Sequence, residues 1–177
     1  MLQDYKIHCE ERKEQGIPPL PLSAQQTSEL VELLKSEHQE SELLLELLKE
    51  RTPAGVDQSA YVKAGFLADI TTGKTSSPYI SKKEAVIILG TMLGGYNIQP
   101  LVKCLEDDEL GEEAANAFSK TLLIFDEFNE ILKLSETTKN AKTVINAWAE
   151  GAWFQEKEKI HEQIKLTAYK ATGEIIQ

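Results

Sequence analysis

One stretch of the sequence comes close to a known phosphate-binding pattern. Residues 68–75 read ADITTGKT, with Ala68 at the position where a phosphate loop has its first glycine. Such a loop lies between a strand and a helix, so that free backbone N–H groups converge on the anion. Here the apolar periodicity predicts a helix before the pattern and a loop after it. Because this order is wrong for phosphate binding, we interpret Gly73 as a helix end and keep nucleotide binding through Gly73-Lys74-Thr75 as the less favoured alternative.

Two other groups of side chains could in principle hold a metal ion. Residues 106–113 contain six carboxylates but lack the ligand spacing and the central glycine of a calcium loop. We interpret them as acidic residues that complement the N-terminal dipole of a following helix. His8 and Cys9 are adjacent, but the sequence offers no second pair to complete a tetrahedral site. His38 and His161 stand isolated among charged residues, so we expect surface roles for all three histidines.

No other motif in the sequence predicts catalysis. Gly-x-Ser-x-Gly, Cys-x-x-Cys and Gly-x-Gly-x-x-Gly patterns do not occur. Cys9 and Cys104 are separated by 95 positions, which is typical of reduced thiols in a cytoplasmic protein. We therefore expect no catalytic, cofactor-binding or metal-ligating residue in this chain.

The composition predicts a soluble globular protein. The chain has 177 residues, enough for one domain with the start of another, and is 41% hydrophobic and 27% charged. Its net charge of −10 argues against a standing surface for nucleic acid or anionic membranes. No secretory signal is visible in the first residues, and the longest apolar run, near residues 85–93, is too short to cross a bilayer. We expect a cytoplasmic location and no membrane partner.

The predicted helices are organised around residues 82–105, which read KKEAVIILGTMLGGYNIQPLVKCL. Ser81 and Glu84 have the spacing of a capping box, and Asn97 is expected to cap a second helix after the Gly94-Gly95 turn. Two amphipathic helices on so short a turn should lie antiparallel, which is the repeating unit of an α-solenoid. The apolar stripes on the two helices are Val86, Leu89, Gly90 and Leu93, and then Ile98, Leu101, Val102 and Leu105.

Two helices joined by a stiff connection are predicted at the start of the chain. The first spans residues 2–15 and ends at Gly16, which adopts a left-handed conformation easily. Three prolines between residues 18 and 21 then favour a rigid, extended strap. Ser23 and Gln26 form a capping box for the second helix, which runs to about residue 35.

Two further helices are predicted before residue 81. The leucine-rich stretch 42–51 is apolar around most of its circumference, so it should be covered on more than one side. Asp57 caps a helix that runs to about residue 72. Its close-packing stripe is predicted to be Tyr61, Ala64, Gly65 and Ala68.

The pattern after residue 110 predicts a long helix with a break between residues 126 and 133, and then a helix over 140–151. Trp153 and Phe154 are expected to close the last helical layer. The apolar positions of the long helix are Ala114, Ala117, Phe118, Thr121, Leu122 and Phe125.

The last stretch changes its period from helical to alternating. Residues 164–169 alternate apolar and polar side chains, which is typical of a strand. One strand in an otherwise helical chain has no partner, so we expect the natural protein to continue beyond Gln177. The predicted division is a helical domain over residues 1–160 and the beginning of an α/β domain over residues 161–177.

Several segments resemble the N-terminal region of the bacterial aconitate hydratase B family, in the same order along the chain. They are YKIHCEERKEQGIPPLPL from Tyr5, GVDQSAYVKAGFLADI from Gly55, LGTMLGGYNIQPL from Leu89, TLLIFDEFNEI from Thr121, the Trp148 and Trp153-Phe154 positions, and YKATGE from Tyr169. The resemblance covers essentially the whole chain, and it implies an all-α, HEAT-like helical domain followed by a swivelling α/β domain.

The resemblance also implies a function for the complete enzyme. Members of the family interconvert citrate and isocitrate through cis-aconitate, and many also handle 2-methylisocitrate. They use a 4Fe–4S cluster held by three cysteines in later domains, so neither Cys9 nor Cys104 is carried over as a ligand. The helical domain is linked to homodimer formation and to access to the active site, and it adjoins the remaining domains of the enzyme. Members that lose the cluster bind messenger RNA, although the acidic charge argues against an RNA surface on this domain alone.

Two classes of function therefore stand beside the nucleotide-binding alternative. The first is a non-catalytic domain of an aconitate hydratase of the citric acid cycle. The second is a self-standing helical-repeat adaptor that recruits a protein partner. A coding sequence that continues past Gln177 with three cluster cysteines would favour the first, and a stop codon would favour the second.

Overall fold

The computed structural model describes residues 1–121, 124 and 127–150, and within these ranges it is helical without strands. This confirms the all-α prediction for the described part of the chain. The helices are α1 (Leu2–Glu14), α2 (Ala24–Leu34), α3 (Ser41–Glu46), the π-helix η1 (Leu47–Arg51), α4 (Gln58–Thr71), α5 (Lys82–Gly90), α6 (Ile98–Cys104), α7 (Gly111–Phe118), α8 (Glu127–Leu134) and α9 (Lys139–Glu150).

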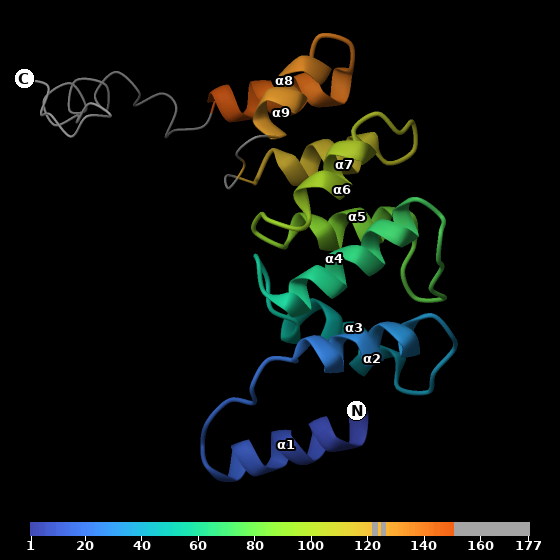
Figure 1. Ribbon diagram of the computed structural model, residues 1–177, viewed down its shortest axis with the longest axis vertical. Helices are drawn as coiled ribbons and strands as arrows, with labels where there is room; N and C mark the ends of the chain where they lie inside the picture. Colours follow the sequence, from blue (N-terminus) through green and yellow to red (C-terminus); the bar gives the residue numbers. More distant parts are fainter. Residues whose placement is uncertain (122–123, 125–126, 151–177) are drawn as a thin grey trace, which may run out of the picture.

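The helices are stacked in successive layers along the long axis of the molecule (Figure 1). Helix α2 packs on α4, α4 on α5, α5 on α7 and α7 on α9, while α6 lies beside α5 and α7. A single hydrophobic core of buried side chains runs through these layers. Within the described ranges, no helix is both long enough and apolar enough to cross a membrane.

Two of the predicted helix starts have the geometry that the sequence implies. Ser23 Oγ accepts from the N–H of Gln26 at 3.2 Å, and Gln26 Oε1 accepts from the N–H of Ser23 at 2.9 Å, which completes the capping box of α2. Asp57 Oδ1 accepts from the N–H of Ser59 at 2.8 Å at the start of α4. Both predictions are confirmed.

The capping box predicted for α5 is only half formed. Ser81 Oγ accepts from the N–H of Glu84 at 3.2 Å. The carboxylate of Glu84 instead accepts from Lys49 Nζ at 2.9 Å, so it links α5 to η1. A charge-assisted contact between elements has replaced the second capping bond.

Polar contacts hold α1 and the proline strap against the rest of the molecule. Tyr5 is the one buried residue of α1, and its hydroxyl donates to the carbonyl of Leu20 at 3.1 Å. Arg51 donates from Nε to the Tyr5 oxygen at 3.0 Å and from its terminal nitrogen to the carbonyl of Pro19 at 2.5 Å. Gly16, with φ of +71°, ends the first helical stretch as predicted.

The leucine-rich segment is covered on several sides, as expected. Leu44, Leu47 and Leu48 are fully buried, and Leu43 and Leu45 are partly buried against the core. The segment continues as η1 and ends at Arg51, and the last carbonyl groups of a helix need donors from outside it.

Three carbonyls of η1 accept hydrogen bonds from groups outside this helix. Leu47 O accepts from Thr52 Oγ1 at 3.1 Å, and Arg51 O accepts from the N–H of Leu22 at 2.8 Å. Lys49 O accepts from Lys63 Nζ at 3.4 Å. Lys63 is only 2% exposed, and burial lowers its pKa from 10.5 to about 8, although the nearby charge of Glu50 partly opposes this effect.

The packing stripe predicted for α4 is wrong. Gly65 and Tyr61 are exposed, and of the four predicted positions only Ala64 is buried. The buried face lies further round the helix and consists of Ala60, Lys63, Ala64, Phe66, Leu67, Ile70 and Thr71, with Ser59 at its start. The large apolar side chains decide which face turns inward, because they bury more surface than the small ones.

The long helix predicted after residue 110 is also wrong. Helix α7 ends at Phe118, and α8 occupies the stretch where a break was expected. The carbonyl of Phe118 accepts from the N–H of Thr121 and from Trp148 Nε1, both at 2.9 Å, so the regular helical bonding pattern stops there. The predicted apolar positions Leu122 and Phe125 lie outside the described residues.

The final described helix agrees with the sequence. Helix α9 buries Val144 and Trp148 on one face, as its period predicts. Trp153, Phe154, the predicted strand and the predicted domain boundary at residue 160 lie outside the described residues.

Lys63 provides a test of the fold through its pH dependence. Its folded-state pKa of about 8 lies below its ordinary value of 10.5, so the unfolded chain binds the proton more tightly. Stability should therefore rise with pH, by about 2 kcal/mol between about pH 7.5 and 9.5. Lys63→Met has a similar volume and should lose this rise, as measured by urea unfolding of both proteins across the range. If the free energy of unfolding has the same pH dependence in the two proteins, burial does not lower the pKa of Lys63.

Candidate interaction surface

The stretch that resembles a phosphate loop is the end of α4. Gly73 has φ of +73°, its N–H donates to Ile70 O at 3.1 Å, and the N–H of Lys74 donates to Asp69 O at 2.9 Å. These two bonds form a Schellman motif, in which the residues after a helix satisfy its last carbonyls. The interpretation of Gly73 as a helix end is confirmed.

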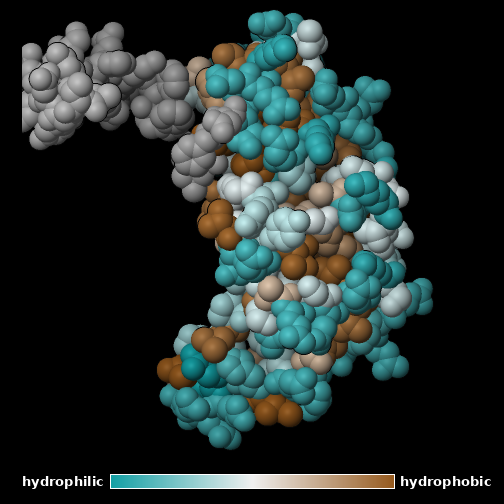
Figure 2. All heavy atoms as spheres, viewed as in Figure 1, coloured by the Kyte–Doolittle hydropathy of each residue, from teal (hydrophilic) through white to brown (hydrophobic). Residues whose placement is uncertain are grey.

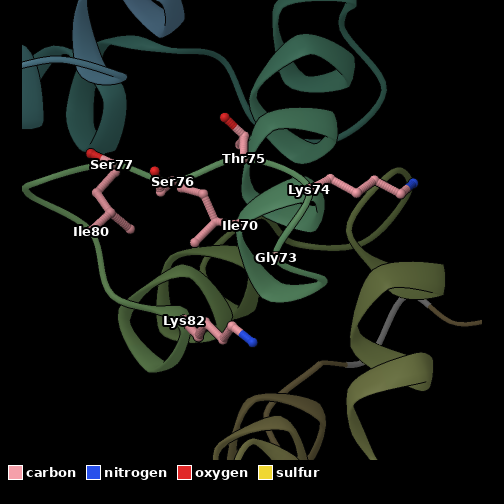
Figure 3. A pocket seen from close by; sticks show the side chains of 8 residues that line it. All are labelled: Ile70, Gly73, Lys74, Thr75, Ser76, Ser77, Ile80 and Lys82. Carbon is pink, nitrogen blue, oxygen red and sulfur yellow. The ribbon is translucent and has the colours of Figure 1, made fainter.

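This geometry does not favour anion binding. The N–H of Thr75 also points back to Asp69 O at 3.2 Å, and Lys74 Nζ lies 3.7 Å from the Asp69 carboxylate. The loop borders an open hollow of about 480 Å³, but the ammonium groups of Lys74 and Lys82 extend away from the hydroxyls of Ser76 and Ser77 (Figure 3). A helix C-terminus also carries a partial negative charge, which opposes a phosphate group.

The candidate metal ligands have other partners. His8 Nε2 accepts from the N–H of Leu20, and His38 Nδ1 accepts from the N–H of Glu40, both at 3.0 Å. Over residues 1–121, 124 and 127–150, no group of three or more His, Cys, Asp or Glu side chains could hold a metal ion. His161 lies outside these residues.

The acidic run serves the start of α7. Asp107 Oδ1 accepts from the N–H groups of Glu109 at 2.8 Å and Leu110 at 2.9 Å. Glu112 and Glu113 lie in the first turn of α7, where negative charge is favourable. The helix-dipole interpretation is confirmed.

The two cysteines do not fit an iron–sulfur cluster, which needs several thiolates close together. Cys9 is half-buried on α1, Cys104 is buried on α6, and both are free. Burial raises the pKa of the Cys104 thiol, although a hydrogen bond with Thr71 partly opposes this effect. The described part of the chain therefore offers no cluster site.

Two glycine-containing loops meet near the middle of the stack. The N–H of Gly55 donates to Met92 O at 3.1 Å, which joins the loop before α4 to the loop after α5. A Cβ atom on Gly95 would lie 3.0 Å from Gly55 O and 3.1 Å from Val56 Cγ1, so the two loops are in close contact. We call the patch that they form the two-loop surface, and its lining residues are Ala54, Gly55, Val56, Leu93, Gly94, Gly95, Ile98 and Glu127.

The two-loop surface is apolar and open to solvent. Val56 is 75% exposed and Leu93 is 68% exposed beside a hollow of about 510 Å³. Glu127 is the one charged residue of the lining. Hydrophobic atoms protrude from the edge of the molecule at the level of these loops (Figure 2). The prediction that Leu93 belongs to a buried stripe is wrong, because Leu93 leaves the helix with φ of +65°.

Asn97 holds the turn in place, but not as the predicted cap of α6. It is fully buried, and its Nδ2 donates to Leu89 O, near the end of α5, at 2.8 Å. Between these residues, Leu93, Gly94 and Gly95 all have positive φ, at 65°, 109° and 88°. The tight turn at the glycines is confirmed, and the side chain that fixes it bonds back to the preceding helix.

Comparison with known proteins identifies the domain. The family model described as the aconitate B N-terminal domain matches residues 4–154. The chain belongs to this family. It is 54% identical over 177 residues to aconitate hydratase B of Synechocystis sp., 48% identical over 176 residues to that of Pseudomonas aeruginosa and 46% identical over 176 residues to that of Escherichia coli. Each match covers 98% of this chain and 20% of the relative.

The family resemblance of the sequence is thereby confirmed, and the chain spans about a fifth of the length of the aconitate hydratases B that it matches.

The sequence analysis did not predict the two-loop surface. The signal in the sequence was an apolar residue beside glycine in each loop, Val56 after Gly55 and Leu93 before Gly94. Nothing in their spacing shows that the two loops meet.

Asn97 gives a test of how the turn is held. Asn97→Asp would place a carboxylate against Leu89 O without a donor, whereas Asn97→Ala only removes the bond. We expect Asn97→Ala to lower the free energy of unfolding by about 1–3 kcal/mol and Asn97→Asp to lower it further, as measured by denaturant unfolding near neutral pH. At acidic pH the protonated Asp can donate again, so the gap between the two variants should narrow. A variant Asn97→Asp as stable as the parent at neutral pH would contradict this assignment.

Proposed function

We propose that this chain is the non-catalytic N-terminal domain of an aconitate hydratase of the citric acid cycle, which interconverts citrate and isocitrate through cis-aconitate. The observation that carries the proposal is the match of residues 4–154 to the aconitate B N-terminal domain family, together with 54% identity to an aconitate hydratase B. The use of 2-methylisocitrate by the same enzyme and a cytoplasmic location are parts of this proposal.

The domain is proposed to be a HEAT-like solenoid over residues 1–160, followed by the start of a swivelling α/β domain over residues 161–177. The succession of α2, α4, α5, α7 and α9, each packed on the next, supports the solenoid. In a solenoid, each repeat is stabilised mainly by contacts with its neighbours. This arrangement leaves an extended outer surface for binding partners.

The chemistry is proposed to lie in the rest of the enzyme. The family resemblance implies a 4Fe–4S cluster held there, and the placement of Cys9 on α1 and Cys104 on α6 supports this proposal. No residue of this chain is proposed to act in catalysis, cofactor binding or metal binding.

The partners proposed for the domain are macromolecular. They are the remaining domains of the same enzyme and a second copy, which would form a homodimer through the helical domain. Messenger RNA is a proposed partner of the full-length, cluster-free form. The net charge of −10 argues that this domain does not supply the RNA surface alone.

Activity measurements test this function. The full-length protein, reconstituted anaerobically with iron and sulfide, should form cis-aconitate from citrate, and residues 1–177 treated in the same way should not. The absorbance of cis-aconitate gives the readout, and the full-length protein before reconstitution is the control. Turnover by the chain alone would contradict its non-catalytic role, and an inactive reconstituted full-length protein would contradict the family function.

A further inference from the structure

We propose that the two-loop surface is the docking site for the rest of the same polypeptide, with Leu93 and Val56 as its apolar anchors. This inference rests on the proposed function, because it requires an enzyme that continues beyond this chain. The partner would present one or two bulky apolar side chains to the hollow of about 510 Å³, and a lysine or arginine to Glu127 at its edge.

The conformation of Leu93 is the first argument for a binding role. A leucine with φ of +65° is strained, because its Cβ crowds the backbone in the left-handed region. The side chain is 68% exposed, so burial within the domain does not offset this strain. Strained, exposed apolar residues are typical of functional surfaces, where a partner supplies the missing contacts.

The second argument is that the surface is preformed. The bond from the N–H of Gly55 to Met92 O joins the loops, and the buried bond from Asn97 to Leu89 fixes the base of the turn. Gly95 has a φ of +88°, and a Cβ atom there would lie only 3.0 Å from Gly55 O, so the two loops are in close contact. A surface held in this way loses little conformational entropy when a partner binds.

The size of the surface favours a partner on the same polypeptide over a second copy. A stable dimer buries roughly 800 Å² on each partner, and Val56 and Leu93 are too few to form the apolar centre of such an interface. A covalently linked partner needs fewer contacts, because the connection keeps it at a high effective concentration. A symmetric contact between two copies would also enclose one Glu127 carboxylate from each copy in an apolar interface.

The position of the end of α9 agrees with this partner. The matched relatives are about five times as long as this chain, which covers 20% of each. In Figure 1, the C-terminal end of α9 lies on the same side of the stack as the loop between α5 and α6. The last described helix therefore ends on the side of the two-loop surface.

The first experiment compares labelling of thiols at exposed positions. Leu93→Cys and Val56→Cys are made in the chain and in the full-length protein, with Ile87→Cys, 51% exposed on α5, as the matched control. Maleimide labelling is quantified for each peptide by mass spectrometry. The thiols at positions 93 and 56 should label at least about tenfold more slowly in the full-length protein than in the chain, and the thiol at position 87 should not change.

A second variant separates docking from folding. Leu93→Asp should leave the isolated chain folded, because Asp tolerates positive φ better than leucine. In the full-length protein it should raise the rate of limited proteolysis between domains at least about fivefold, and Ile87→Asp should not.

The outcomes distinguish the possible partners. Equal labelling at position 93 in the chain and in the full-length protein would overturn the docking site. The full-length protein is also diluted until light scattering shows monomers. If the thiol at position 93 is protected from labelling only before dilution, the surface contacts a second copy, and the proposed docking site is overturned. The hydratase activity of the full-length protein is measured separately. If the enzyme is active and the thiol at position 93 is not protected from labelling, only the docking site is refuted. If the reconstituted enzyme is inactive, the proposed function is refuted.

Discussion

A single buried hydrogen bond fixes the middle of this domain. Asn97 Nδ2 donates to Leu89 O at 2.8 Å, which returns the start of α6 to the end of α5. Helix α5 is itself packed between α4 and α7, and residues 91–97 form the short path from α5 to α6. Along that path Gly94 and Gly95 adopt positive φ, and Leu93 is turned out into solvent.

The hydrogen bond from Asn97 to Leu89 also shapes the two-loop surface. Because the turn is fixed, Gly95 lies against Gly55, and the loop before α4 is held in contact with the loop after α5. Residues whose types could do chemistry are used elsewhere in structural contacts: Lys74 beside Asp69, His8 at the strap, Asp107 at the start of α7. In the described part of the molecule, these side chains therefore serve contacts within the fold.

Local signals in the sequence predicted the features that depend on neighbouring residues. Ser23 with Gln26, Asp57 and Gly73 lie within a few positions of the groups that they bond, so the pattern alone identifies these helix ends. The burial of the leucine-rich segment was predictable for a similar reason, since leucines cover most of its circumference. Features that depend on which face of a helix packs inward, or on distant residues, were not predictable. The sequence around Gly65 fits a packing face, but the larger side chains of Phe66, Leu67 and Ile70 are buried instead. Asn97 looks like a helix cap, and its bond to Leu89 requires knowledge of how α5 ends. The end of α7 depends partly on Trp148, which is 30 positions away.

The central claim is that this chain serves the enzyme through its surfaces and supplies no reacting group. The most direct measurement is kcat/KM for citrate in the full-length enzyme that carries Cys9→Ser, Cys104→Ala, His8→Gln and His38→Asn together. These substitutions remove both described thiols and both described imidazoles, and Gln and Asn can still accept a backbone hydrogen bond. The account predicts a value within about twofold of the parent enzyme, whereas a fall of about a hundredfold or more, typical of a lost catalytic acid or base, would contradict it.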